Sequence, residues 1–202
     1  MISRHTPNTH KKLKNAYIGI AGLGGLGSNI AASLARMGIG KLLLVDYDLV
    51  EPSNLNRQHY FIKNIGMKKT EALEKILKEI NPYVKVKTKN IFLEKNNIKT
   101  IFEKVDIIIE AFDNPESKAE IVNVVLKDMT QIIIASSGVA GYYSCNLIKT
   151  KKINDRFYLI GDEFSEAKPG CGLMSPRVSV AANHQANLAI NIILNGGDEN
   201  YG

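Results

Sequence analysis

The sequence predicts an α/β fold: a Rossmann-like, doubly wound, mostly parallel sheet with helices on both faces, plus short antiparallel strands in the C-terminal part. Strand-like runs rich in Ile and Val alternate with helical patterns up to residue 135. A glycine-rich turn joins the first strand to the first helix. The 202 residues fit one domain, with an N-terminal segment 1–15, a Rossmann-like part 16–135 and a C-terminal part 136–202.

The elements of the Rossmann-like part follow from the spacing of the apolar residues. We expect strands at 16–21, 41–46, 83–88, 105–110 and 131–135. We expect helices at about 25–37, 67–80 and 115–129. The helix at 67–80 is well marked, because its apolar residues form one stripe: Ala72, Leu73, Ile76, Leu77 and Ile80. It ends at Asn81-Pro82, since proline cannot continue a helix.

The C-terminal part has a different pattern. Two short, antiparallel strands are expected at 146–150 and 156–160. The segment 161–176 is irregular and rich in Gly and Pro, so we expect a functional lid or crossover loop, or a disordered segment. An amphipathic helix at about 177–195 is expected to end at Gly196-Gly197.

Composition and charge exclude several classes. No apolar run approaches the roughly 20 residues that span a bilayer, and the polar, basic N-terminus is unlike a secretory signal, so we expect a cytoplasmic protein without a membrane partner. The net charge of +6 is mild, and aromatic residues do not interleave with the basic ones, which argues against nucleic-acid binding. Cys145 and Cys171 belong to no CxxC pair, so no zinc site of paired cysteines is expected.

The stretch GLGGLG follows a strand and opens a helix, as phosphate-binding turns do. In this pattern Gly22 permits the tight turn, Gly24 leaves room for a phosphate, and Gly27 lets the helix pack closely on the sheet. Asp46 ends the next strand, where a carboxylate accepts hydrogen bonds from ribose hydroxyls. These residues indicate an adenine nucleotide and leave NAD and ATP open.

The loop after Asp46 favours ATP. It contains Asn54, Arg57 and Gln58, and Lys68 or Lys69 opens the following helix. A dinucleotide needs no such cluster, whereas the fork of an arginine and the point charge of a lysine suit a triphosphate.

Asp113 lies in the sequence EAFDN, directly after the strand at 105–110. In this fold class the carboxyl ends of the strands are where ligands bind. A carboxylate that faces a polyphosphate suits Mg²⁺, which fills its other positions with water and phosphate oxygens. We therefore expect Asp113 to hold Mg²⁺.

Four motifs in this order resemble those of the E1-like activating enzymes, which include the ThiF/MoeB/HesA family: GLGGLGSN, DYDLVEPSNLNRQ, GMKKTEAL and AFDNPESKA. The resemblance covers roughly residues 15–150. Three later phrases are similar to short, zinc-free ThiF proteins of thiazole and thiamine biosynthesis and extend the match to about residue 195: DRFYLIGDE, GLMSPRV and AANHQANLA.

The resemblance implies an ATP-dependent adenylyltransferase. It would join the C-terminal Gly-Gly carboxylate of a small ubiquitin-like sulfur carrier to AMP, as an acyl-adenylate, and release pyrophosphate. The nucleotide would be bound by these residues: Gly22, Gly24, Gly25, Gly27, Asp46, Asn54, Arg57, Gln58 and Lys69. Arg57, Lys69 and Asp113 with Mg²⁺ would act in catalysis, Lys68 would be a surface residue, and no histidine would be essential.

Some implications depend on departures from the family pattern. Relatives use an arginine from the partner subunit of a homodimer against the phosphates, and Arg4 is the candidate here, the alternative being a disordered tail. Relatives also use a crossover-loop cysteine for a covalent step, and Cys171 lies in about that region, although adenylation alone requires no thiol. The family's Thr-Asp-Asn is Phe-Asp-Asn at 112–114, and the family's two zinc-binding CxxC pairs are absent.

Three other functions remain open at this point. The same fold and chemistry would serve a different acceptor, such as a molybdopterin-type carrier, a peptide or a tRNA base. An NAD-dependent oxidoreductase would leave Arg57, Lys69 and Asp113 without a role. A non-catalytic binding module would be expected to have lost at least one of these residues or Asp46, and all four are present.

Overall fold

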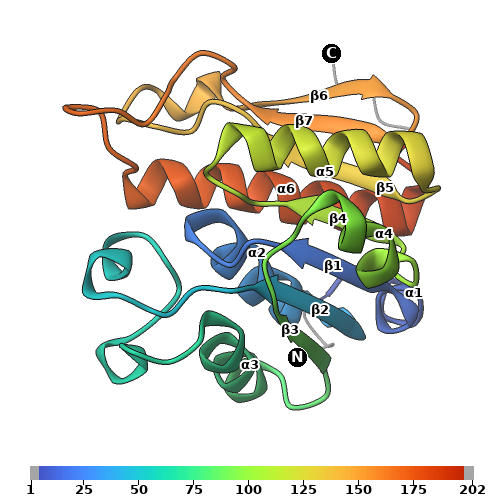
Figure 1. The fold of residues 1–202 in the computed structure, drawn as a ribbon. Helices are drawn as coiled ribbons and strands as arrows, with labels where there is room; N and C mark the ends of the chain where they lie inside the picture. Colours follow the sequence, from blue (N-terminus) through green and yellow to red (C-terminus); the bar gives the residue numbers. More distant parts are fainter. Residues whose placement is uncertain (1–4, 198–202) are drawn as a thin grey trace.

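The computed structural model describes residues 5–197 (Figure 1). Arg4, the predicted contact from a partner subunit, lies outside the described residues. One seven-stranded sheet has the order β3-β2-β1-β4-β5-β7-β6. The strands are β1 (Tyr17–Ala21), β2 (Lys41–Asp46), β3 (Lys85–Asn90), β4 (Ile107–Glu110), β5 (Ile132–Ser136), β6 (Lys149–Asn154) and β7 (Phe157–Gly161). The α-helices are α1 (His10–Asn15), α2 (Gly25–Met37), α3 (Lys69–Ile80), α4 (Lys95–Phe102), α5 (Pro115–Asp128) and α6 (Ser175–Asn195).

The strand pairing confirms the predicted α/β fold class. Strands β3, β2, β1, β4 and β5 pair in parallel, β7 continues parallel to β5, and β6 returns antiparallel to β7. Every residue of β4 is buried, and nearly every residue of β1 and β5, as expected for parallel strands covered on both faces. The edge strands β3 and β6 are instead rich in lysine and largely exposed, which discourages further pairing at the edges.

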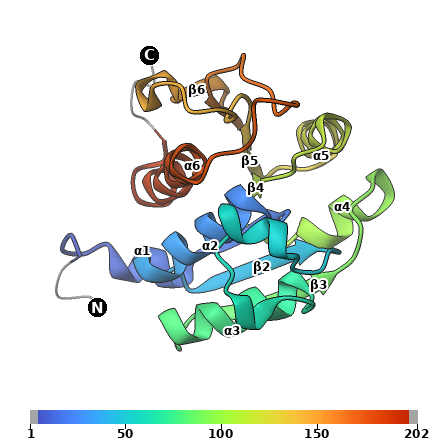
Figure 2. The ribbon, with the colours of Figure 1, turned by 90° about the vertical axis from the view of Figure 1, so that its left-hand side faces the viewer.

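Helices cover both faces of the sheet. Figure 2 shows α5 and α6 on opposite sides of β4 and β5, with α1, α2 and α3 on the side of α6 and α4 on the side of α5. The buried side chains accordingly form two clusters, a larger one around α2 and α6 and a smaller one around α4 and α5.

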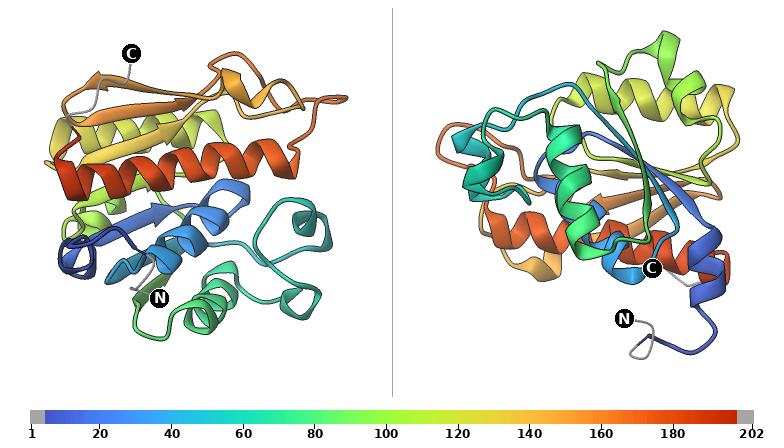
Figure 3. Two further views of the ribbon diagram at one scale, coloured as in Figure 1. Left: turned by 180° about the vertical axis from the view of Figure 1, so that it is seen from behind. Right: turned by 90° about the horizontal axis from the view of Figure 1, so that it is seen from below.

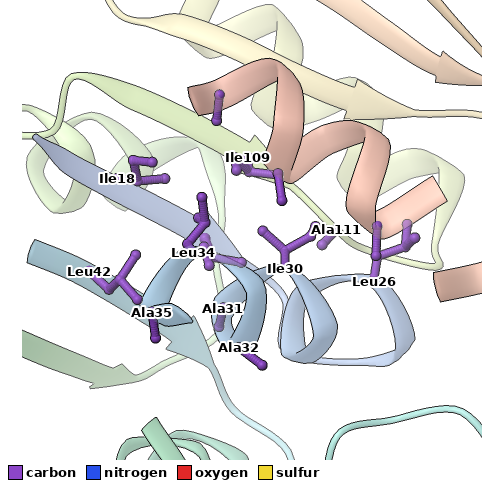
Figure 4. Close-up of a cluster of buried hydrophobic side chains, with 14 of the residues drawn as sticks. Ile18, Leu26, Ile30, Ala31, Ala32, Leu34, Ala35, Leu42, Ile109 and Ala111 are labelled. Carbon is purple, nitrogen blue, oxygen red and sulfur yellow. The ribbon is translucent and has the colours of Figure 1, made fainter. Parts of the chain in front are cut away.

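Helix α2 is the central packing element. Figure 4 shows its side chains, including Ile30 and Leu34, gathered with Ile18 and Ile109 of the strands, and all four are fully buried. On its other side α2 packs along α6, which is plain when the molecule is seen from behind (Figure 3). The start of α2, which forms part of the glycine turn, is therefore held firmly against the sheet.

Two helices and several element boundaries differ from the sequence-based prediction. Helices α1 and α4 were not predicted, because α1 buries only Leu13 and α4 only Ile98 and Phe102, too few residues for a visible stripe. The strand expected at 146–150 begins at Lys149, since a 3₁₀ turn at Cys145–Leu147 precedes it. Helix α6 begins two residues earlier than expected, at Ser175, with proline at its second position.

Candidate nucleotide and acceptor site

A cavity of about 570 Å³ lies at the carboxyl ends of the parallel strands. The loop after β2 and the loop after β7, coloured teal and orange in Figure 1, project on this side of the sheet. One side, which we call the glycine-turn wall, is lined by Gly22, Gly24, Gly25, Asp46, Asp48, Arg57, Gln58 and Lys69. The opposite side, which we call the loop wall, consists of Ser136–Ala140 after β5 and Glu163–Ala167 after β7. Asp113 and Lys118 lie in the floor between them.

The three glycines of the turn, Gly22, Gly24 and Gly27, have different surroundings in the structure. Gly22 has a φ of +90°, and a Cβ there would lie 2.9 Å from the carbonyl oxygen of Ala111. A Cβ at Gly27 would lie 1.9 Å from the carbonyl oxygen of Gly22, so this glycine serves packing and does not line the cavity. At Gly24 the nearest atom to a Cβ is the Nε2 of Gln58, at 3.7 Å, an ordinary van der Waals distance, and Gly24 lines the cavity.

Asp46 connects the end of β2 to the glycine turn. Its Oδ2 accepts a hydrogen bond of 2.7 Å from Leu23 N, and its Oδ1 accepts one of 2.8 Å from Asp48 N. Burial raises the pKa of Asp46 above its ordinary value, against the lowering effects of Lys69 and these two N–H groups. Each carboxylate oxygen keeps a further lone pair, so the group still has acceptor capacity toward the cavity.

Arg57 and Gln58 present buried polar atoms without partners. The Nε of Arg57 and the Oε1 of Gln58 are both buried and have no hydrogen-bond partner, while Nη1 of Arg57 donates to Asn56 Oδ1 at 2.8 Å. A buried polar atom without a partner costs stability, and such atoms beside an open glycine turn fit a polar ligand. Arg177 Nε, which does not line the cavity, also lacks a partner, so the fit depends on the position of the Arg57 and Gln58 atoms beside the turn as well as on their lack of a partner.

Asn54 supports this loop from outside the cavity. Its Oδ1 accepts a hydrogen bond of 3.1 Å from Glu51 N, and its side chain does not line the cavity. Two residues of the GLGGLGSN motif attach the same loop to the turn, and sequence reasoning gave them no role. Ser28 Oγ accepts from His59 N at 2.9 Å, and Asn29 Nδ2 donates to the carbonyl oxygen of Arg57 at 2.9 Å.

Lys69 and Lys68 differ sharply. The side chain of Lys69 is 8% exposed, lines the cavity and donates from Nζ to Asp48 Oδ2 at 2.6 Å. The side chain of Lys68 is 49% exposed and pairs with Glu71 on the surface. Asp48 thus binds Lys69, the lysine of the two that lines the cavity. Sequence reasoning missed Asp48, although it is the second acidic residue of the DYD sequence.

Asp113 follows β4 on the floor of the cavity and is exposed to it. The turn that carries Asp113 is fixed by Glu110, which is fully buried and accepts from Phe112 N at 2.6 Å. Lys118 Nζ donates to Glu110 Oε1 at 3.0 Å and to Ser136 Oγ at 3.0 Å, and so links β4, β5 and the first turns of α5. Sequence reasoning missed Glu110 and Lys118, because only the folded sheet brings the ends of β4 and β5 together.

The cysteines and histidines lie apart from the cavity lining. Cys171 is half-buried, Cys145 is exposed, and both thiols are free. His59 and His184 do not line the cavity, and burial and the neighbouring Arg36 lower the pKa of His59. No three His, Cys, Asp or Glu side chains among residues 5–197 group as a metal site, so a metal at Asp113 would need ligand oxygens from a bound phosphate.

The sheet is doubly wound, a glycine turn follows β1, an acidic residue ends β2, and a cavity lies at the carboxyl ends of the strands. These features define a Rossmann-like nucleotide-binding protein. The chain belongs to the ThiF family, whose family model matches residues 1–202. This confirms the resemblance to the E1-like activating enzymes.

Curated relatives match part of the chain. "Adenylyltransferase and sulfurtransferase UBA4" of Kluyveromyces lactis is 38% identical over 128 residues, which is 62% of this chain and 29% of that protein. "Ubiquitin-like modifier-activating enzyme 5" of Caenorhabditis elegans is 32% identical over 140 residues, 64% of this chain and 33% of that protein. "tRNA threonylcarbamoyladenosine dehydratase" of Haemophilus influenzae is 36% identical over 120 residues, 58% of this chain and 46% of that protein. The matched region is thus less than half of each of these relatives.

Solved structures match nearly the whole chain. The E. coli tRNA N6-threonylcarbamoyladenosine dehydratase TcdA, in complex with ATP, superposes with a TM-score of 0.85 at 21% identity, over 96% of this chain and 91% of that chain. This identity shows the shared fold. E. coli MccB superposes with a TM-score of 0.71 at 27% identity, over 92% of this chain and 57% of that chain. Among the described residues, no helix is long and apolar enough to cross a membrane.

Proposed function

We propose that this protein is an ATP-dependent adenylyltransferase that activates the C-terminal Gly-Gly carboxylate of a small, ThiS-like sulfur carrier for thiazole and thiamine biosynthesis. The observation that carries the proposal is the pair of buried, unpartnered atoms, Arg57 Nε and Gln58 Oε1, beside the open glycine turn and Lys69. The donors of Arg57 and Lys69 suit a triphosphate and have no role in hydride transfer, whereas Gln58 Oε1 is an acceptor and suits a hydroxyl or N–H group of the ligand.

The glycine-turn wall would bind ATP as a substrate. Backbone N–H groups at the start of α2 would face the phosphates, Asp46 would accept from the ribose hydroxyls, and Arg57 and Lys69 would neutralise phosphate charge. Mg²⁺, when bound with ATP, would supply further charge neutralisation, and the exposed carboxylate of Asp113 on the cavity floor fits it.

The acceptor would enter along the loop wall. One carboxylate oxygen of the carrier would attack the α-phosphorus, a P–O bond to that oxygen would form, and the bond to the bridging oxygen between the α- and β-phosphates would break. The carboxylate is already ionised at neutral pH, so the protein needs no general base. Its task would be to align the reactants and to stabilise the charge on the departing pyrophosphate, and Arg57 and Lys69, which line the cavity, would supply that charge stabilisation.

Three finer elements of the proposal rest on the family alone. A homodimer would bring Arg4 of one subunit to the phosphates of the other. Cys171, which lies off the cavity lining, would act only in a covalent step after adenylation. The N-terminal segment 1–15, the nucleotide-binding part 16–135 and the carrier-binding part 136–202 would form one catalytic domain.

A second acceptor has specific support. The Haemophilus influenzae relative and the E. coli structure TcdA are tRNA threonylcarbamoyladenosine dehydratases, and the latter superposes over almost its whole length. The same cavity would then adenylate or dehydrate a modified base instead of a carrier carboxylate.

The test is pyrophosphate–ATP exchange with Mg²⁺ and a ThiS-type carrier that ends in Gly-Gly. We expect exchange that requires the carrier, is lost in Asp113→Ala, and persists in Asp128→Ala, which removes an exposed carboxylate at the far end of α5. Measurable ATP binding without carrier-dependent exchange would contradict this acceptor. ATP turnover that depends on tRNA would then establish the alternative.

A further inference from the structure

The GLGGLG turn, the SNLNRQ loop and Asp113 have roles in the proposed function, whereas the phrase GLMSPRV does not. Its arginine, Arg177, is 2% exposed and is the largest fully buried side chain among the described residues. Burying a guanidinium costs folding free energy unless its N–H groups are hydrogen-bonded, so the contacts of Arg177 need to be explained.

Arg177 links the chain directly beside the two segments of the loop wall. Its Nη1 donates at 2.7 Å to the carbonyl oxygens of both Tyr143 and Ser144, in the chain that continues from Ala140. Its Nη2 forms an ion pair with Asp162, directly before Glu163. The guanidinium carbon also lies 5.7 Å from the centre of the Tyr143 ring.

Asp162 extends this link along the wall. Its Oδ1 accepts from Phe164 N at 3.0 Å and from Ser165 N at 2.8 Å, and Asp162 N donates to the carbonyl oxygen of Gly138 at 3.0 Å. A Cβ at Gly138 would lie 2.0 Å from Asp162 Oδ1, so this close approach requires a glycine. Ser165 Oγ completes the connection by accepting from Ala140 N at 3.1 Å.

The next residue on α6 contacts the opposite wall. Val178 lines the cavity, and its Cγ1 lies 3.1 Å from where a Cβ at Gly25 would be. The first turn of α6 therefore touches the glycine turn through Val178 and holds the loop wall through Arg177. Because α6 packs along α2, both contacts have a rigid support.

We propose that Arg177 is a positioning residue that fixes the loop wall relative to the glycine turn, so that the acceptor is aligned with the α-phosphate of ATP. The identity of the acceptor in this inference rests on the proposed function. The role of Arg177 in fixing the loop wall rests on geometry alone. Arg177 does not line the cavity and touches no reactant; it acts through Asp162 and the carbonyl groups of Tyr143 and Ser144. Removing it would disturb acceptor alignment and leave ATP binding intact.

The test compares Arg177→Met, Arg177→Lys and Asp162→Asn with the matched control Arg156→Met. Arg156 also donates to backbone carbonyl oxygens, those of Met129 and Leu126 at 2.8 Å, but at the far end of α5. For each protein, ATP affinity is measured by calorimetry, and the KM for the ThiS-type carrier and kcat by pyrophosphate exchange.

For Arg177→Met we expect ATP affinity within about twofold of wild type, together with a fall in kcat/KM for the carrier of about 10²-fold, as for reactants misplaced by about 1 Å. Arg177→Lys and Asp162→Asn should lie between Arg177→Met and wild type. Arg156→Met should leave all three constants unchanged. Equal losses of ATP affinity and of carrier kcat/KM in Arg177→Met, or the same split in Arg156→Met, would overturn the proposal.

If wild type binds ATP but shows no carrier-dependent exchange, the proposed carrier is wrong and the wall is tested directly. Hydrogen–deuterium exchange is then measured on segments 138–144, 162–166 and 22–27. We expect at least about tenfold faster exchange in the first two segments of Arg177→Lys and Asp162→Asn, with 22–27 unchanged. Unchanged protection of the first two segments would overturn the positioning role. Loss of protection in all three would do the same.

Discussion

The two walls of the cavity are held together by different kinds of contact. In the glycine-turn wall, the backbone packs closely, since Gly27 lies directly against the carbonyl oxygen of Gly22, and one carboxylate, Asp46, accepts from Leu23 N and Asp48 N. In the loop wall, two irregular segments are joined by the side chains of Ser165, Asp162 and Arg177. Under the proposed function, ATP would therefore meet a wall fixed by close backbone packing, and the acceptor would meet a wall fixed by the side chains of Ser165, Asp162 and Arg177.

The largest effect is expected within the glycine-turn wall, at two glycines of the same turn. Gly27→Ala should destabilise the protein by about 3 kcal/mol or prevent folding, because its Cβ would overlap the carbonyl oxygen of Gly22, which cannot move without shifting β1. Gly24→Ala has room for a methyl group and should fold normally. That methyl group would occupy the space left for a phosphate, so ATP affinity should fall. Urea unfolding and calorimetry with ATP measure the two effects.

Two results would contradict the prediction for Gly27→Ala and Gly24→Ala. If Gly27→Ala unfolds like wild type and Gly24→Ala does not, the assignment of one glycine to packing and the other to ligand is wrong. If Gly24→Ala binds ATP as well as wild type, the phosphates lie elsewhere in the cavity.

A smaller effect is expected when a charge is removed from the glycine-turn wall. Lys69→Ala should lower pyrophosphate exchange by about 10²-fold, the cost of losing one preorganised group that stabilises transition-state charge. ATP affinity should fall with it, in contrast to the split expected for Arg177→Met. Lys68→Ala, which removes an exposed ion pair with Glu71, should change both quantities by less than about twofold. Equal effects of the two substitutions would remove Lys69 from the proposed machinery.

The two walls were also unequally predictable from the sequence. Gly22, Gly24, Gly27 and Asp46 lie within one strand–helix–strand unit, so their spacing fixes their relative positions once the fold class is known. The helices α2, α3 and α5 could also be predicted from local sequence, because each has enough apolar residues at helical spacing to form a recognisable face.

The loop wall could not be predicted in the same way. Arg177 meets Tyr143 and Ser144 across more than thirty residues, and nothing in the local sequence at either end indicates the contact. Lys118 reaches Glu110 and Ser136 only because β4 and β5 are neighbours in the sheet. Such contacts form between residues that are far apart in the sequence and depend on the folded topology, whereas a sequence motif fixes only the relative positions of residues that are close in the sequence.

The smallest expected effect compares the two buried aspartates, one from each wall, whose pKa values are shifted in opposite directions. Burial raises the pKa of Asp46 above the ordinary 3.8, so the folded state binds its proton more tightly than the unfolded state does. Its ionisation therefore costs stability as pH rises through this range. Burial also acts to raise the pKa of Asp162, but the N–H groups of Ser165 and Phe164, the Ser165 side chain and Arg177 outweigh it, and the pKa is lowered.

Asp162 consequently contributes stability that is present above the unfolded-state pKa and is lost as pH falls through its lowered folded-state value. We expect the unfolding free energy of wild type minus that of Asp46→Asn to decrease from about pH 3 to about pH 7, a range that spans ordinary aspartate titration. The same difference for Asp162→Asn should increase over that range. Urea unfolding at several pH values measures both. If both free-energy differences changed in the same direction with pH, the pKa values of Asp46 and Asp162 would not be shifted in opposite directions.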